Sequence, residues 1–268
     1  MSTLPTVFFG HGSPTIAIEE SDATRAWRRI ALEIGRPKAI LAISAHWLTR
    51  GTGVTAMAAP KTIHDFGGFP ELRHVQYPAP GHPALASRVA ELLSPTPVHL
   101  DGGQWGLDHG AWSVLVHAYP DAGIPVVQLS MDATKPPAWH FEMGQRLSPL
   151  RDEGVLIMGT GNVVHNLGTM DWGARYGAPY DWAERFHGYV RSSIEQDQPQ
   201  PLIDYQAQTR GDALLAQPSP DHYWPLLYVL GARRPEDMVR IGPDHIEYRS
   251  ISMLTAVFDS RSQRLRAA

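Results

Sequence analysis

The stretch that decides the fold is VLIMGTGNVVHN, residues 155–166. Residues 155–158 are continuously apolar, and three of the four are branched, which is typical of a short strand covered on both faces of a sheet. Two glycines and a threonine follow at once, and His165 comes a few positions later. Because ligand sites of open α/β sheets lie outside the carboxyl ends of the strands, this pattern predicts a site at the end of a buried strand.

Similar short apolar runs occur at residues 6–9, 39–44 and 125–130. Amphipathic helical patterns lie between and after these runs, at residues 21–34, 82–93, 109–119, 139–147, 181–194 and 224–230. Strands that alternate with helices predict an α/β fold with a mainly parallel or mixed central sheet flanked by helices.

We find no repeat, linker or change of composition that would mark a domain boundary. The sequence therefore predicts a single catalytic domain over residues 1–268, with a frayed polar tail at residues 259–268. The partial alternation of residues 245–258 predicts a pair of antiparallel strands that closes one edge of the sheet.

Three histidines follow the ends of predicted strands. His11 lies in GHGSP after residues 6–9, His46 lies in AHW after residues 39–44, and His165 follows residues 155–158. If the three strands are parallel, these side chains point into one crevice. Imidazole binds zinc, iron, copper and nickel well, so the pattern predicts a metal site at the carboxyl ends of the strands.

The chain has 268 residues, 13 histidines and no cysteine. The absence of cysteine excludes disulfides, thiolate zinc sites, cysteine-ligated iron–sulfur clusters and a cysteine nucleophile. A metal here must be held by imidazole, carboxylate, carbonyl or water. The chemically possible further ligands are His222, which precedes the helical pattern at 224–230, and Glu142, Asp108 and Asp132.

His109 lies at the start of a predicted helix, beside Asp108. Asp108 is a typical N-cap residue, so His109 is either a polar residue of the helix start or a proton donor or substrate contact. The other eight histidines have no comparable context, and we expect them to be surface or structural residues. They are His64, His74, His82, His99, His117, His140, His187 and His245.

The formal net charge is −4, and the basic residues are scattered without a stripe. We therefore expect no nucleic-acid partner. We also expect no membrane span and no signal peptide, and with no cysteine the sequence favours a cytoplasmic protein. The segment GTGNVV lacks the third glycine of the dinucleotide-binding pattern, which argues against that cofactor. Residues 61–77 and 169–180 are candidate lid loops.

Five motifs occur in one order along the chain: GHGSP at 10–14, SAHW at 44–47, LDHGAW at 107–112, GTGNVVHN at 159–166 and HYWPLL at 222–227. Together they resemble the class III extradiol ring-cleavage dioxygenases, specifically the DOPA 4,5-dioxygenase-like branch. The resemblance extends over nearly the whole chain, from about residue 7 to residue 258.

The resemblance implies roles for five histidines. His11, His46 and His222 would bind the metal, and His165 would be the catalytic acid/base that can also bind the metal when no substrate is present. His109 would be a second catalytic residue, which either lies behind the metal ligands or contacts the substrate. The resemblance further implies Fe(II) in turnover with Zn(II) as an occupant of the same site. The substrates would be O2 and a catechol such as DOPA, opened to a muconic semialdehyde-type product.

Two other functions stay open at this point. The same histidines could form a zinc hydrolase, in which a metal-bound hydroxide attacks an ester or amide and His165 is the general base. The chain could also be a non-catalytic relative that uses its cleft to bind a metabolite or a protein. Oxygen consumption with a catechol would separate the dioxygenase from the zinc hydrolase, and a protein without metal affinity would favour the non-catalytic relative.

Overall fold

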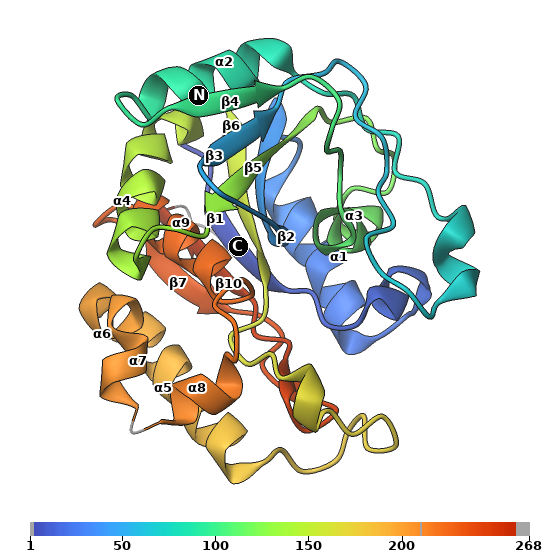
Figure 1. Ribbon diagram of the computed structural model, residues 1–268, viewed down its shortest axis with the longest axis vertical. Helices are drawn as coiled ribbons and strands as arrows, with labels where there is room; N and C mark the ends of the chain where they lie inside the picture. The colour runs from blue at the N-terminus through green and yellow to red at the C-terminus, as the bar shows by residue number, and fades with distance from the viewer. Residues whose placement is uncertain (1–2, 210, 261–268) are drawn as a thin grey trace.

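The computed structural model describes residues 3–209 and 211–260, and a large mixed sheet forms its centre (Figure 1). The strands of this sheet lie in the order β4-β3-β5-β2-β6-β1-β10-β7. Their bounds are β1 Thr6–Gly10, β2 Ala39–Thr49, β3 Thr52–Thr55, β4 Val98–Asp101, β5 Val126–Asp132, β6 Val155–Gly161, β7 Met238–Ile241 and β10 Ala256–Asp259. A separate small sheet pairs β8 Ile246–Glu247 with β9 Ile251–Ser252.

The middle of the sheet consists of β5, β2, β6 and β1, which run parallel to one another. These are the four strands that the apolar runs predicted, and their carboxyl ends therefore meet at one edge. Strands β3, β10 and β7 add antiparallel pairs on either side. The predicted α/β fold with a mainly parallel or mixed sheet is confirmed.

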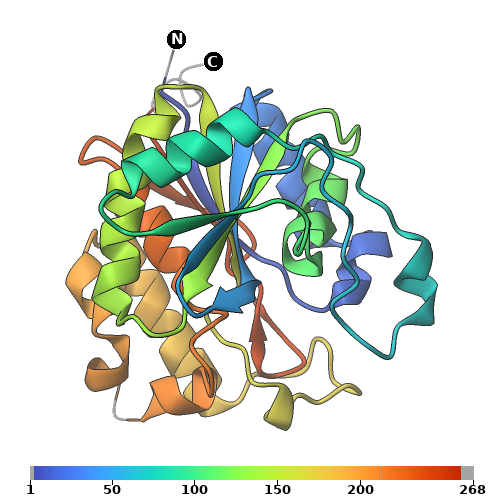
Figure 2. The ribbon, with the colours of Figure 1, turned by 45° about the horizontal axis from the view of Figure 1, so that its top comes forward.

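Helices cover both faces of the sheet (Figure 2). Alternate residues of a strand face opposite sides, and β1 shows this, because Val7 and Phe9 pack into one core and Phe8 into the other. Helices α1 and α3 cover the first face, and α2, α4, α5 and α9 the second. The helices are α1 Asp22–Ile34, α2 Pro83–Leu92, α3 His109–Ala118, α4 Pro137–Leu147, α5 Asp181–Glu195, α6 Pro199–Ile203, α7 Tyr205–Gln208, α8 Asp212–Ala216 and α9 Trp224–Ala232.

The carboxyl-terminal region differs from the prediction. The predicted antiparallel pair forms, as β8 with β9, but it makes its own small sheet and closes no edge of the large sheet, inside which β10 lies between β1 and β7. β10 carries the apolar residues Ala256, Val257 and Phe258, which suit a position between two strands, and all four of its residues are buried there. The predicted frayed tail begins too early, since Asp259 belongs to β10, and residues 261–268 lie outside the described residues.

Among the described helices, none combines the length and the apolar character that crossing a membrane requires.

Candidate metal and substrate site

Five histidines meet at the carboxyl edge of the parallel strands. His11 directly follows β1, His46 lies in the last part of β2, and His165 follows β6. His109 is the first residue of α3, and His222 precedes α9. All five side chains line one pocket of about 300 Å³. The structure therefore brings together each histidine that the sequence singled out for a functional role.

The rings lie in direct contact with one another. The Nε2 atoms of His11 and His46 are 3.3 Å apart. The ring of His222 stacks on that of His165, with centroids 3.4 Å apart and planes at 4°. The His222 centroid is 5.4 Å from that of His11 and 5.0 Å from that of His46, and the His109 ring lies 3.8 Å from His46.

Two glycines of the sequence motifs permit this close approach. A Cβ atom on Gly161, at the end of β6, would lie 2.2 Å from the carbonyl oxygen of His222. A Cβ atom on Gly110, in the first turn of α3, would lie 2.7 Å from Cδ2 of His46. Real Cβ atoms essentially never come so near another heavy atom, so these positions require glycine for the histidines to converge.

Two carboxylates lie beside three of the imidazoles, and sequence reasoning missed both carboxylates. Asp221 accepts a hydrogen bond from Nδ1 of His222. Asp65 accepts one from the backbone N–H of His109, and its oxygens lie 3.0 Å from Nδ1 of His109 and 3.4 Å from Nδ1 of His46. The Asp-His dipeptide was a usable signal for Asp221, whereas Asp65 lies in a loop without a recognisable motif.

The environment keeps four of the clustered imidazoles neutral, those of His11, His46, His165 and His222. Burial, and then the neighbouring histidines, hold the pKa values of His11 and His222 well below 6.5. Burial lowers the pKa of His46 to about 3 and that of His165 to about 4. Neutral imidazole is the form that binds a metal and the form that accepts a proton.

The donor set fits a metal ion. Two nitrogens that each lie about 2.0–2.1 Å from one tetrahedral ion are about 3.3–3.4 Å apart, and the Nε2 atoms of His11 and His46 have this spacing. Nε2 of His222 is buried and has no hydrogen-bond partner, which costs free energy unless a ligand occupies it. Ring nitrogens of His11, His46 and His109 also lie within 4.8 Å of one another, so His109 and His222 compete for the third position.

The carboxylates that the sequence left as possible ligands lie elsewhere. Glu142 pairs with Arg146 on the surface of α4, Asp132 accepts from Thr134, and Asp108 accepts from Ser44. Asp108 also accepts from the backbone of Ala111, as its predicted role as the α3 N-cap requires. None of these three carboxylates is among the described residues that line the pocket.

The remaining histidines are also outside the pocket lining, as far as the chain is described. Several make structural bonds: the side chain of His82 caps α2, His117 pairs with the Ile16 carbonyl, and His187 lies between Asp244 and Ser252.

Both candidate lid loops reach the pocket. The loop at 61–77 contributes Phe66 and Phe69 to its wall, and the loop at 169–180 contributes Met170 and Trp172. Their opening and closing stays a prediction.

Comparison with known proteins gives a consistent result. The model of a family described as the catalytic LigB subunit of aromatic ring-opening dioxygenase matches residues 5–259. A protein of Escherichia coli K12 named "4,5-DOPA dioxygenase extradiol" is 52% identical over 256 residues, covering 94% of this chain and 93% of its own. A protein of Beta vulgaris with the same name is 38% identical over 235 residues, covering 85% and 86%. The crystal structure of an uncharacterised E. coli K12 protein superposes with a TM-score of 0.83 at 46% identity, covering 96% of this chain and all of that one.

Proposed function

The chain belongs to the aromatic ring-opening dioxygenases of the LigB family, and from this premise we propose that it opens a catechol of the DOPA type beside a metal ion held by His11, His46 and His222. It is a metal-dependent extradiol dioxygenase that acts on a small aromatic molecule and O2. DOPA is the substrate in the names of its relatives. The expected product is a muconic semialdehyde.

One observation carries the choice of ligands. Nδ1 of His222 bonds to Asp221, so the tautomer leaves the Nε2 lone pair free, and this buried atom has no other partner. A carboxylate behind an imidazole is the common arrangement of metal-binding histidines. Nδ1 of His109 likewise lies beside a carboxylate, that of Asp65, so the choice rests on Nε2 of His222, which is buried and unpartnered, whereas Nε2 of His109 is not such an atom. We therefore propose that His109 contacts the substrate with its Nε2.

The metal itself is part of the proposal. When bound, the ion supplies chelation of the two adjacent catechol hydroxyls, which lowers their pKa values, and it activates O2. An all-imidazole donor set suits both iron and zinc. We propose Fe(II) in turnover, with Zn(II) as another occupant of the same site.

His165 is proposed as the acid/base. It is neutral near pH 7, because burial lowers its pKa to about 4, and it stacks directly on the proposed ligand His222. Its neutral ring could therefore take a proton from a catechol hydroxyl and, once charged, return it to an oxygen atom of the substrate as the catechol ring opens. Asp65 fixes His109 on the opposite side, where its ring can hydrogen-bond a substrate oxygen.

The test replaces the acid/base and follows oxygen uptake with a catechol. General acid–base catalysis contributes about 100- to 10,000-fold, so we expect His165→Ala to slow oxygen uptake by at least about 100-fold while metal content stays at the wild-type level. Undiminished oxygen uptake in this variant would contradict the proposed proton role. Ester or amide hydrolysis without oxygen uptake in the wild type would instead support the zinc hydrolase reading.

A further inference from the structure

A row of aromatic rings leads from the histidines to the mouth of the pocket. Phe66, Phe69 and Trp172, here called the aromatic rim, all line the pocket. The ring centroids of Phe66 and Phe69 are 6.0 Å apart, and those of Phe69 and Trp172 are 6.3 Å apart. Two loops that are distant in sequence, 61–77 and 169–180, thus join their aromatic side chains along one wall.

The rim begins at the reacting end of the pocket. The ring of Phe66 meets that of His109 edge-on at 5.1 Å, whereas Trp172 at the other end is 61% exposed. A catechol whose hydroxyls lie among the histidines can extend its ring substituent along this row. The pocket volume of about 300 Å³ leaves room for such a substituent beyond one six-membered ring.

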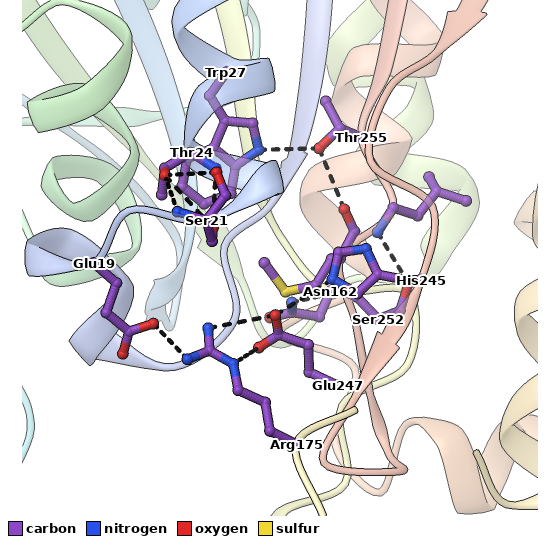
Figure 3. Close-up of polar contacts among 12 residues, drawn as sticks. Glu19, Ser21, Thr24, Trp27, Asn162, Arg175, His245, Glu247, Ser252 and Thr255 are labelled. Carbon is purple, nitrogen blue, oxygen red and sulfur yellow. Dashed lines mark hydrogen bonds and ion pairs between the residues drawn. The ribbon is translucent and has the colours of Figure 1, made fainter. Parts of the chain in front are cut away.

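The exposed indole is held on a tethered loop. The backbone N–H of Asp171 donates to the carbonyl of Tyr248, and the Tyr248 N–H donates to the carbonyl of Arg175. Figure 3 shows the Arg175 guanidinium between Glu19 and Glu247. Its Nη1 lies 2.6 Å from Oε2 of Glu19, and its Nε lies 3.0 Å from Oε2 of Glu247. The indole itself packs against the ring of Tyr248, with the centroids 5.5 Å apart, so Trp172 is held at the pocket wall although it is exposed.

The charge of the pocket wall selects among substituents. The described lining residues include one carboxylate, Asp65, and no lysine or arginine. Aromatic faces carry a negative potential that attracts ammonium groups. Asp65 is already engaged by His46 and His109, so the attraction for a cationic substituent comes from the aromatic faces, and a carboxylate finds no lysine or arginine among these residues.

We propose that Phe69 and Trp172 determine specificity by binding the ring substituent of the catechol, and that the preferred class carries an ammonium group rather than a carboxylate alone. This inference rests on the proposed catechol function. It adds the part of the substrate that is recognised and the residues that recognise it.

Binding measurements test the inference directly. Zinc-loaded wild type, W172A and F69A are titrated without oxygen by calorimetry with catechol, 4-(2-aminoethyl)catechol and 3-(3,4-dihydroxyphenyl)propanoate. The matched control is Y176A, since Tyr176 is on the same loop and 73% exposed but is not a lining residue. Thermal melts check that each variant folds.

Loss of a cation–π contact weakens binding by roughly 2- to 30-fold, depending on how far the contact is shielded from water. We therefore expect W172A and F69A each to weaken binding of the amine within roughly this range, with binding of unsubstituted catechol unchanged within about twofold. Wild type should bind the amine at least about fivefold more tightly than the propanoate, and Y176A should bind all three like wild type.

Equal weakening for all three catechols, unchanged amine binding in both variants, or tighter binding of the propanoate would overturn the inference. Oxygen uptake is measured in parallel with the iron-loaded enzyme. If the wild type consumes oxygen with none of the three catechols, the proposed function is contradicted. The order of the three affinities still decides the role of the aromatic rim.

Discussion

Removal of the Asp221 carboxylate should weaken metal binding without unfolding the protein. In the structure, Asp221 accepts a hydrogen bond from Nδ1 of His222, and burial holds the His222 pKa well below 6.5. This bond orients the ring and fixes its tautomer with Nε2 free. The variant D221A loses both effects and leaves a buried N–H without a partner.

The expected magnitude follows from the kind of bond that is lost. A hydrogen bond to a charged group contributes about 1.5–3 kcal/mol, and loss of a carboxylate behind a metal-binding histidine typically costs about 10- to 100-fold in metal affinity. Because these two ranges overlap, we expect the Zn²⁺ dissociation constant of D221A to rise by about 10- to 100-fold.

The assay titrates metal-free protein with Zn²⁺ in competition with a chromophoric chelator. D244A is the matched control, since Asp244 also bonds a histidine, His187, and its side chain is 16% exposed against 19% for Asp221. Asp244 lies outside the pocket lining, so D244A should keep the wild-type affinity. Wild-type affinity in D221A, or equal weakening in D244A, would refute the reasoning.

Two further predictions concern stability. Arg151 and Asp237 form an ion pair whose side chains are 0% and 1% exposed. Removal of one partner of a buried pair costs about 3–5 kcal/mol, so R151M should lower the free energy of unfolding in urea by that amount. A much smaller loss would contradict the role of this pair in stability. Burial raises the pKa of Asp244, but a neighbouring imidazole and guanidinium lower it by more, to a net value below 3.8. The ionised carboxylate therefore stabilises the fold above about pH 4, and this contribution is lost as pH falls through the folded-state pKa. The free energy of unfolding in urea, measured from pH 6 to pH 3, should thus fall less steeply in D244N than in wild type.

The sequence predicted the centre of the sheet and its histidines for a local reason. Strands buried on both faces are continuously apolar, so β1, β2, β5 and β6 are recognisable without knowledge of their partners. The histidines that end these strands were then expected at one edge, since parallel strands share the direction of their carboxyl ends.

The outer strands could not be predicted in the same way. β3, β4 and β7 have four residues each, and their pairing depends on contacts distant in sequence. The turn between β8 and β9 places Tyr248 and Arg249 at positive φ, where glycine or asparagine would have signalled a hairpin.

The carboxylates of the site depended on tertiary structure. Asp65 reaches His46 and His109 only because a long loop folds back over the sheet edge. The aromatic rim likewise joins two loops whose proximity has no local signature in the sequence. Residue type and spacing thus identified the imidazoles, but not the groups that orient them or the wall that faces the substrate.

The central claim is that His222, and not His109, completes the metal site with His11 and His46. The most direct test is the metal-to-protein ratio of H222A and H109A, measured by mass spectrometry after loading with Fe(II) or Zn²⁺ and removal of unbound metal. The account predicts that H222A loses most of its metal and that H109A keeps the wild-type content. Retention of metal by H222A together with its loss from H109A would contradict the claim and assign the third position to His109.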